Sequence, residues 1–515
     1  MGRAIVIGAG FGGLAAALRL RAAGLSVDVF DNQAIAGGRA GVYQRDGYTF
    51  DAGPTVITAP FLFDELFELF GKRRADYVVF QPLMPWYRIC FADGRSFDYG
   101  GTRDELINAV RRFAPGDVEG YTRLLQKVEQ IYKVGFEQLG DRPFDDVSSM
   151  LRVLPQMAML RSDRSVYEFV SHYLKNEALR RVFSFQPLLV GGNPFHTTSI
   201  YSLIQHLERK DGVHFAMGGT AALVAALVQL AEEAGVHFHL GQRVTEVLIE
   251  EGRATGVRLE DGREEHAGCV VANADAPALY SKLVPAQWRK RWTDRRIESK
   301  KYSMGLFVMY LGVRRQYPEL AHHTILLGKL YKELLEEIFE GHLLSDDLSL
   351  YLHAPTRTDP TLAPEGCESL YVLAPVPNLR AGIDWAREKP RLEERVLDIL
   401  EATVCPGIRE TLEVRFSVTP EHFRVNLLTH HGTGFSIQPT LLQSAWFRFH
   451  NRSEDVEGLY LVGAGTHPGA GLPGVLCSAK VLEHYLPEIL ARGHNEPEEI
   501  VSTSHLQAEP QEAAR

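Results

Sequence analysis

The sequence predicts an α/β fold with more than one domain. The chain opens on a strand, a glycine-rich turn, a helix and a second strand, and it closes on a strand, a glycine-rich loop and a helix. Of its 515 residues, 45% are hydrophobic and 23% are charged, which is typical of a globular protein with a large core. A chain of this length is expected to form two or three domains.

The opening unit is typical of a Rossmann-like, dinucleotide-binding domain. Ala4–Gly8 is a short apolar strand, Leu14–Gly24 is rich in helix-forming residues, and Ser26–Asp31 alternates like a second strand. The turn from Gly8 to Gly13 fits the pattern G-x-G-x-x-G, whose glycines allow a tight turn, a close approach to a pyrophosphate and close packing of helix on sheet. Asp31, at the end of the second strand, is expected to accept hydrogen bonds from ribose hydroxyls.

The middle of the chain alternates between helical and strand-like segments. Helices are expected at Phe61–Phe70, over much of Arg103–Val166, from Met217 to Gly235 and around Leu330–Phe339. Strand-like runs are expected at 236–240, 242–250, 254–262 and Gly268–Asp275, and at several places between Lys301 and Thr419. The tail at 493–515 is acidic, polar and free of aromatic residues, so we expect it to be disordered.

Net charge and cysteine content exclude several classes of protein. Lys and Arg total 55 against 65 Asp and Glu, and the resulting net charge of −10 argues against a nucleic-acid partner. Five scattered cysteines without a C-x-x-C spacing argue against a disulfide framework and favour a reducing cytoplasm. Every long uncharged stretch contains polar residues or Gly and Pro, so no segment is expected to span a membrane.

A second glycine motif favours a flavin over a nicotinamide cofactor. Gly37-Gly38-Arg39 follows Asp31 closely, and the arginine offers a fork-shaped donor to a phosphate. This element resembles the flavin-binding signature of the amine oxidase and phytoene desaturase superfamily.

Four further segments resemble the bacterial-type phytoene desaturases, a group of carotenoid desaturases. They are Asp51–Thr58, Ser184–Phe195, Ser349–Pro355 and Leu459–Ala479, and the resemblance extends over nearly the whole chain apart from the tail. The pair His322-His323 also fits phytoene-type members. Asp31 departs from the family pattern, because many relatives have Glu there, but both carboxylates can hold ribose hydroxyls.

The resemblance implies three structural parts. It implies a discontinuous Rossmann-like FAD-binding domain over 1–70, 215–290 and 440–492, and a mixed α+β substrate-binding domain over 71–214 and 291–439. The latter includes a helical, membrane-facing lid at about 103–214. The residues expected to bind FAD are Gly8, Gly10, Gly12, Gly13, Asp31, Gly38, Arg39, Pro54, Thr55, Val244, Gly463, Gly465, His467, Gly474 and Val475.

The implied activity is an FAD-dependent desaturation of phytoene to neurosporene or lycopene in carotenoid biosynthesis. A hydride passes to the flavin and a proton is released, and oxygen or a quinone reoxidises the flavin.

Asp51 is a candidate proton acceptor, or else a brace for its loop. His467 is either a hydrogen-bond donor at the flavin edge or a loop histidine satisfied by the backbone. Asn273 and Asp275 either approach the cofactor or belong to ordinary sheet structure.

No metal site is expected. Adjacent histidines in a strand point to opposite faces, which argues against chelation by His322-His323 or by His430-His431. Neither pair has an evident third ligand in the sequence.

A lipophilic substrate implies a cytoplasmic protein that associates peripherally with the inner face of the cell membrane. Phe61–Phe70 and Leu151–Arg161 are candidate docking helices, although each apolar stripe equally fits a core. Two other functions remain open: a flavin oxidase acting on amines, porphyrinogens or retinoids, and a non-catalytic lipid- or prenyl-binding protein. The number of desaturations, the electron acceptor, the product isomer and the oligomeric state are not determined by the sequence.

Overall fold

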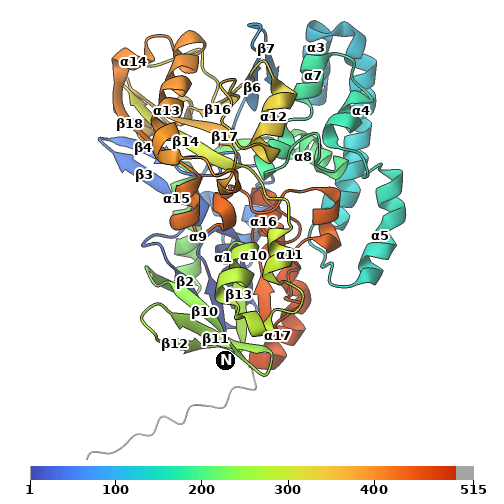
Figure 1. The fold of residues 1–515 in the computed structure, drawn as a ribbon, viewed down its shortest axis with the longest axis vertical. Helices are drawn as coiled ribbons and strands as arrows, with labels where there is room; N and C mark the ends of the chain where they lie inside the picture. The colour runs from blue at the N-terminus through green and yellow to red at the C-terminus, as the bar shows by residue number, and fades with distance from the viewer. Residues whose placement is uncertain (1, 494–515) are drawn as a thin grey trace, which may run out of the picture.

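Two β-sheets, one near each end of the molecule, organise the structure (Figure 1). The computed structural model describes residues 2–493, except for the side chains of 492–493 and of Val147, Ser149, Arg152, Leu154, Gln156 and Ala158. The predicted tail therefore lies outside the described residues from 494 onward. Among residues 2–493, no helix combines the length and the apolar run needed to cross a membrane.

The lower sheet in Figure 1 has five parallel strands in the order β19-β13-β1-β2-β9. Their bounds are β1 (Arg3–Ile7), β2 (Ser26–Asp31), β9 (Val236–Leu240), β13 (Cys269–Ala272) and β19 (Leu459–Leu461). Val6 of β1 pairs with Val29 on one side and Val271 on the other. Parallel sheets are covered on both faces, which explains why the central strands are almost uniformly apolar.

Helices cover one face of this sheet and a second, smaller sheet covers the other. The helices are α1 (Phe11–Ala22), α2 (Phe61–Glu68), α9 (Gly219–Glu233) and α16 (Leu472–Lys480), which share one apolar core. The other face packs against the antiparallel strands β10 (Val244–Glu250), β11 (Arg253–Leu259) and β12 (Glu264–His266). The predicted first helix begins earlier than Leu14, because the last glycines of the turn already have helical conformation.

The upper sheet has seven strands in the order β18-β14-β17-β16-β15-β6-β7. Their bounds are β6 (Tyr87–Cys90), β7 (Ser96–Tyr99), β14 (Gly305–Val313), β15 (His323–Leu326), β16 (Leu350–His353), β17 (Glu368–Val376) and β18 (Leu412–Val418). All neighbours are antiparallel except β15 and β6. Helix α13 (Trp385–Ala402) packs against one face.

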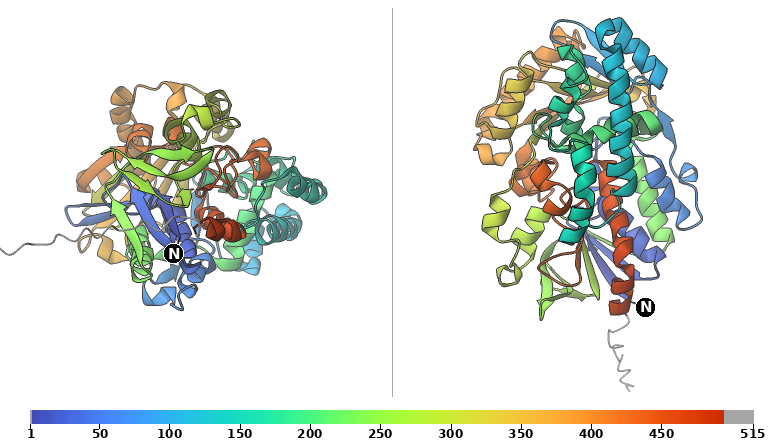
Figure 2. Two further views of the ribbon diagram at one scale, coloured as in Figure 1. Left: turned by 90° about the horizontal axis from the view of Figure 1, so that it is seen from below. Right: turned by 90° about the vertical axis from the view of Figure 1, so that its right-hand side faces the viewer.

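Helices of the middle of the chain line up along one side of the molecule (Figure 2, right). They are α3 (Arg103–Phe113), α4 (Val118–Tyr132) with a following π-helix (Lys133–Gln138), α5 (Val147–Met159), α6 (Val166–Ser171), α7 (Glu177–Val182) and α8 (Leu203–Asp211).

Apart from short 3-10 and π-helical turns, the other helices and strands are α10 (Ala276–Ala278), α11 (Asp294–Glu298), α12 (Tyr331–Glu340), α14 (Ile408–Thr411), α15 (Pro420–Val425), α17 (Leu486–Gly493), β3 (Val42–Arg45), β4 (Tyr48–Asp51), β5 (Phe80–Pro82) and β8 (His214–Ala216). The α/β fold class predicted from the sequence is confirmed.

Candidate cofactor and substrate site

A cavity of about 620 Å³ is lined by residues of both large sheets and of the helices beside them. Most residues predicted to bind a cofactor lie on its wall, although they come from distant parts of the chain. They are Gly8, Gly10, Gly12, Asp31, Gly38, Arg39, Pro54, Thr55, Val244, Gly463, His467, Gly474 and Val475. Gly13, Gly465 and Asp51 are not on the wall.

The glycine turn after β1 has no room for side chains. Gly8 has a φ of +98°, a conformation that favours glycine. A Cβ on Gly13 would overlap the carbonyl oxygen of Gly8, and a Cβ on Gly12 would overlap Oδ1 of Asn273. The turn therefore presents bare backbone to the cavity, as binding of a pyrophosphate requires.

Asp31 is held in place by the backbone at the end of β2. Its Oδ2 accepts a hydrogen bond from the Ala9 amide (2.7 Å) and its Oδ1 accepts one from the Gln33 amide (2.8 Å). Burial raises the pKa of this carboxyl, and the two amide donors oppose the rise. The carboxylate is on the cavity wall, where its remaining lone pairs fit ribose hydroxyls.

Arg39 is half-buried on the cavity wall, and its guanidinium has free hydrogen-bond donors. Within residues 2–493, its Nε and Nη2 have no hydrogen-bond partner. Burial lowers its pKa, and Asp275 supplies an opposing electrostatic effect. A buried, unpaired cation is costly, so the site fits an anionic group such as a dinucleotide phosphate. Together with the glycine turn and Asp31, it makes the residues present a good fit to FAD.

Asn273 and Asp275 follow β13 and approach the cavity rather than serving the sheet alone. Nδ2 of Asn273 donates to the Gly8 carbonyl oxygen (3.4 Å), and Oδ2 of Asp275 accepts from the His430 amide (2.8 Å). Both residues are on the cavity wall. They therefore share a wall with the residues predicted to bind the cofactor, which fits the first of the two alternatives, and cofactor contact stays a prediction.

One ring nitrogen of His467 is hydrogen-bonded to the backbone, whereas the other, Nδ1, is buried and has no hydrogen-bond partner among residues 2–493. Its Nε2 contacts the carbonyl oxygen of Leu139 (3.2 Å), so the ring proton is assigned to Nε2. Burial lowers the pKa of the ring to about 3, which keeps it neutral. Its Nδ1 is then an acceptor only, so the flavin-edge donor suggested by the sequence is not available in this arrangement.

Asp51 is turned away from the cavity and braces helix α9. Its Oδ1 accepts from the Thr220 amide in the first turn of that helix (2.8 Å). Burial raises the pKa of the carboxyl to about 6. The position therefore favours the second alternative considered for this residue, a brace, over a proton acceptor that contacts substrate.

Beyond the predicted cofactor residues the cavity wall is mainly apolar, with a few polar side chains such as Tyr201, Tyr331 and Tyr371. Its wall there includes Phe136, Phe185, Leu188, Ile200, Leu203, Ile204, Met304, Leu306, Ile325, Leu327, Leu334 and Ile338. Phe185 and Leu188 belong to the segment Ser184–Phe195 singled out above, whereas most of the others lie in no recognised motif, because they come from helices and strands that are far apart in the sequence. A long hydrocarbon fits such a surface, because it offers nothing to hydrogen-bond.

Two polar groups in this apolar section were missed by the sequence analysis. Tyr351, inside the segment Ser349–Pro355, contacts Thr55 Oγ1 through its hydroxyl (2.6 Å). Glu208 on α8 lies against the wall and accepts hydrogen bonds from the hydroxyls of Tyr87 (2.9 Å) and Tyr99 (3.1 Å). The side chain of Glu208 is fully buried, and burial raises its pKa to about 7.

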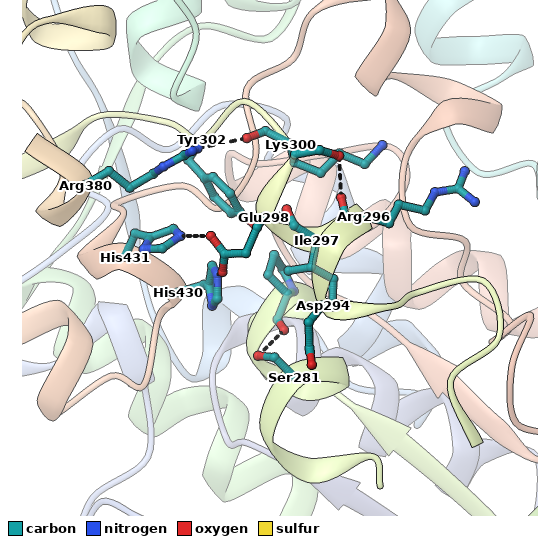
Figure 3. A network of polar contacts seen from close by, with 12 residues as sticks. Ser281, Asp294, Arg296, Ile297, Glu298, Lys300, Tyr302, Arg380, His430 and His431 are labelled. Carbon is teal, nitrogen blue, oxygen red and sulfur yellow. Dashed lines mark hydrogen bonds and ion pairs between the residues drawn. The ribbon is translucent and has the colours of Figure 1, made fainter. Parts of the chain in front are cut away.

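The histidine pairs are not arranged as the sequence analysis assumed. His322 precedes β15, so it is free of the alternation that separates strand neighbours, and its ring lies 4.6 Å from that of His323. His430 and His431 lie in a short 3-10 turn, where Nε2 of each contacts a different oxygen of Glu298, at 2.8 and 3.0 Å (Figure 3). Both pairs therefore have a third potential ligand, His353 in one case and Glu298 in the other.

Known proteins that are similar to this chain point to the same family as the sequence motifs do. The chain matches the family described as flavin containing amine oxidoreductase over residues 11–480. It is 48% identical to the lycopene-forming phytoene desaturase of Pseudescherichia vulneris, over 95% of this chain and 100% of that one. It is 44% identical to the neurosporene-forming phytoene desaturase of Cereibacter sphaeroides, over 96% and 97% of the two chains.

The fold is also found among solved structures. An oxidoreductase from Methanosarcina mazei superimposes with a TM-score of 0.64 at 18% identity, covering 94% of this chain and 100% of that one. Because the identity is low, this similarity establishes the fold alone.

Proposed function

This chain belongs to the phytoene desaturase family of flavin-containing amine oxidoreductases, and from that premise we propose that it is an FAD-dependent desaturase that converts phytoene to neurosporene or lycopene. The observation that carries the proposal is a single cavity with two chemically different sections. One section has bare glycine backbone, Asp31 and the unpaired Arg39, and the other is a wall of aliphatic and aromatic side chains.

One section of the cavity would bind the cofactor and the other would bind the substrate. FAD, when bound, supplies the hydride acceptor for a saturated carbon beside a double bond. The glycine turn and Arg39 bind the phosphates, and Asp31 and Val244 bind the nucleoside end. The apolar wall excludes water and orients the hydrocarbon chain by shape alone, which is how a substrate without polar groups is recognised.

We also propose the discontinuous domain division given by the sequence. Segments 1–70, 215–290 and 440–492 would carry FAD, and 71–214 with 291–439 would carry the substrate. The strands of the five-stranded sheet come only from the first set of ranges, which supports the division.

We propose that the protein associates peripherally with the cytoplasmic face of the membrane, and that α5 docks there. Its outward-facing Leu151 and Met159 are 59% and 74% exposed, whereas Val153 and Met157 of the same helix line the cavity. A helix that is apolar on both sides suits a lipid surface and an entrance for a lipid-dissolved substrate. The other candidate, α2, buries Leu62, Phe63, Leu66 and Phe67, so its stripe is core. The side chain of Arg152 lies outside the described residues.

The proposed activity is tested by expression in a bacterium that accumulates colourless phytoene. The lipid extract should show the three-peaked visible absorption of a conjugated polyene, and its wavelength counts the double bonds added. A matched culture expressing Arg39→Met should stay colourless if FAD binding fails. A colourless extract from cells containing flavin-loaded wild-type protein would refute the proposal and favour an oxidase of amines or porphyrinogens.

A further inference from the structure

Three buried histidines meet on the seven-stranded sheet, outside the wall of the substrate cavity. His322 is 6% exposed, and His323 and His353 are fully buried. The antiparallel register of β15 and β16 places His323 directly opposite His353, and His322 joins them from the bend just before β15. No residue of this cluster has a role in the proposed reaction.

The three rings are arranged around a common point. The ring centroids lie 4.6, 4.8 and 5.4 Å apart, and one ring nitrogen from each residue lies within 4.8 Å of the other two. Nε2 of His322 and Nε2 of His353 are 3.1 Å apart and share a hydrogen bond. Nε2 of His323 has no hydrogen-bond partner among residues 2–493, although it is fully buried.

The outer nitrogens of two rings are held by hydroxyl groups. Nδ1 of His322 lies 2.6 Å from Oγ1 of Thr358, and Nδ1 of His323 lies 2.7 Å from the hydroxyl of Tyr351. A donor at Nδ1 leaves the lone pair of Nε2 free and directed inward. Histidines that bind metals are oriented by this kind of outer hydrogen bond.

We propose that His322, His323 and His353 bind one divalent transition-metal ion of the zinc class through their Nε2 atoms. Three nitrogens at about 2.0–2.1 Å from a tetrahedral ion lie about 3.3 Å from one another, close to the 3.1 Å between His322 and His353. Imidazole ligands select ions such as Zn²⁺, Co²⁺ or Ni²⁺ over Mg²⁺ and Ca²⁺, which prefer oxygen.

A buried carboxylate nearby offers the compensating charge. The ring of Tyr87 lies 5.7 Å from that of His323, and the Tyr87 hydroxyl donates to Glu208. None of the ion pairs among residues 2–493 involves Glu208, so this buried carboxylate, one tyrosine ring away from the cluster, is a negative charge that a cation there would compensate. Burial of each charge is less costly when the other is present.

The second cluster, Glu298 with His430 and His431, fits a bound ion less well. Both carboxylate oxygens of Glu298 already pair with the two Nε2 atoms, and half of the Glu298 side chain is exposed. Among the described residues, no buried side-chain atom of Glu298, His430 or His431 lacks a hydrogen-bond partner, whereas Nε2 of His323 does. His430 therefore supplies the matched control.

A metal ion at the three histidines would have a structural consequence for the cavity. It would join the ends of β15 and β16 to the loop of Thr358 and would fix the His323 ring. That ring holds the hydroxyl of Tyr351, which also contacts Thr55 on the cavity wall. The ion would thus position a wall residue without touching the substrate.

The experiment measures metal content and ligand type on the full-length, flavin-loaded protein incubated with Zn²⁺ or Co²⁺ and then desalted. We expect one ion per chain, an X-ray absorption spectrum dominated by imidazole nitrogen, and the visible absorption of tetrahedral Co²⁺. His353→Asn should bind Zn²⁺ at least about 100-fold more weakly, and Tyr351→Phe about 10–100-fold more weakly. His430→Asn should bind as the wild type does.

The readout does not depend on desaturase activity, so failure of the proposed function would leave it interpretable. Wild-type protein that retains less than about a tenth of an equivalent of either metal overturns the proposal. So does loss of the ion in His430→Asn with retention in His353→Asn. If His353→Asn does not fold, as judged by its flavin content, the absorption spectrum of the wild type decides: oxygen or sulfur ligands in place of imidazole overturn the site.

Discussion

Single residues of the glycine turn determine how closely α1 approaches the sheet. Gly13 lies inside the helix and away from the cavity, so its role is packing rather than cofactor contact. The carbonyl oxygen of Gly8 occupies the space that a Cβ at position 13 would need. Because that neighbour is backbone at the end of β1, it cannot move without shifting the strand.

The variant Gly13→Ala should therefore lose stability and flavin together. We expect the free energy of unfolding to fall by roughly 3 kcal/mol, at the upper end of overpacking costs, as measured by chemical denaturation. Gly116→Ala is the control, because a Cβ there meets no atom within 4 Å. Equal stability of the two variants would contradict the packing role of Gly13.

Glu208 should make stability depend on pH with a definite sign. Its folded-state pKa of about 7 lies above the value of about 4.3 expected in the unfolded chain. The contribution of this group is therefore fully present below the unfolded pKa and is lost as the pH rises through about 7.

The isosteric variant Glu208→Gln removes that titration. The stability of the variant minus that of the wild type should therefore rise by about 4 kcal/mol as the pH goes from about 4 to about 9. Buried neutral histidines such as His467 titrate in the opposite direction but are common to both proteins, so the difference between the two pH profiles isolates Glu208. Parallel profiles would show that its pKa is not raised.

At the scale of elements, α5 combines two features. It exposes Leu151 and Met159 to the outside, while Val153 and Met157 reach the cavity wall. Met150 and Val153 pack with Phe144 and rest against Trp446 and Phe447, so the helix is anchored by a small core of its own. A helix held in this way can lie in a lipid surface without unfolding the domain behind it.

The double variant Leu151→Glu, Met159→Glu should weaken binding to vesicles that contain anionic lipid. Because each apolar side chain contributes about 1.5 kcal/mol or more when buried in lipid, affinity should fall at least about tenfold. Co-sedimentation with vesicles measures it. Leu343→Glu, at a site that is 73% exposed after α12, is the matched control and should bind normally. Unchanged binding of the double variant would exclude α5 as the docking element.

At the scale of the whole molecule, the cofactor site unites segments that are hundreds of residues apart. Gly8 follows β1, Asn273 follows β13 and Gly463 follows β19, and all three lie on the cavity wall. A ligand that contacts all of them stabilises the folded state by mass action.

Removal of FAD should therefore lower the apparent stability of the entire chain. Adding FAD back at about 100-fold above its Kd should restore about 2.7 kcal/mol, as measured by the shift of the unfolding midpoint. Riboflavin is the control, because it lacks the phosphates and adenosine that Arg39 and Asp31 are placed to bind. Equal stabilisation by riboflavin would mean that these residues do not bind the cofactor.

The sequence alone determined the features that depend on local spacing. The turn from Gly8 to Gly13, Asp31 at the end of β2 and Arg39 after its glycines all lie within about one βαβ unit, where short connections set the geometry. The positions of α9 and α12 also agree with the prediction, because their helical patterns are long, and β14 and β17 lie in the region between Lys301 and Thr419 where strand-like runs were expected. The assignment of individual residues to FAD stays a prediction, supported by the shared cavity wall.

Only the tertiary structure decided what depends on contacts between distant segments. Glu208 on α8 meets Tyr87 on β6 and Tyr99 on β7, and no local pattern links these residues. Asp51 belongs to a recognisable motif, but only the packing of α9 shows that its carboxylate accepts a hydrogen bond from the Thr220 amide, which favours a bracing role. Strand alternation does not separate the rings of the histidine pairs, because His322 lies just before β15 and because His430 and His431 lie in a 3-10 turn. Such pairings follow from sheet order and helix packing, which are set by the sum of many nonlocal contacts rather than by residue spacing.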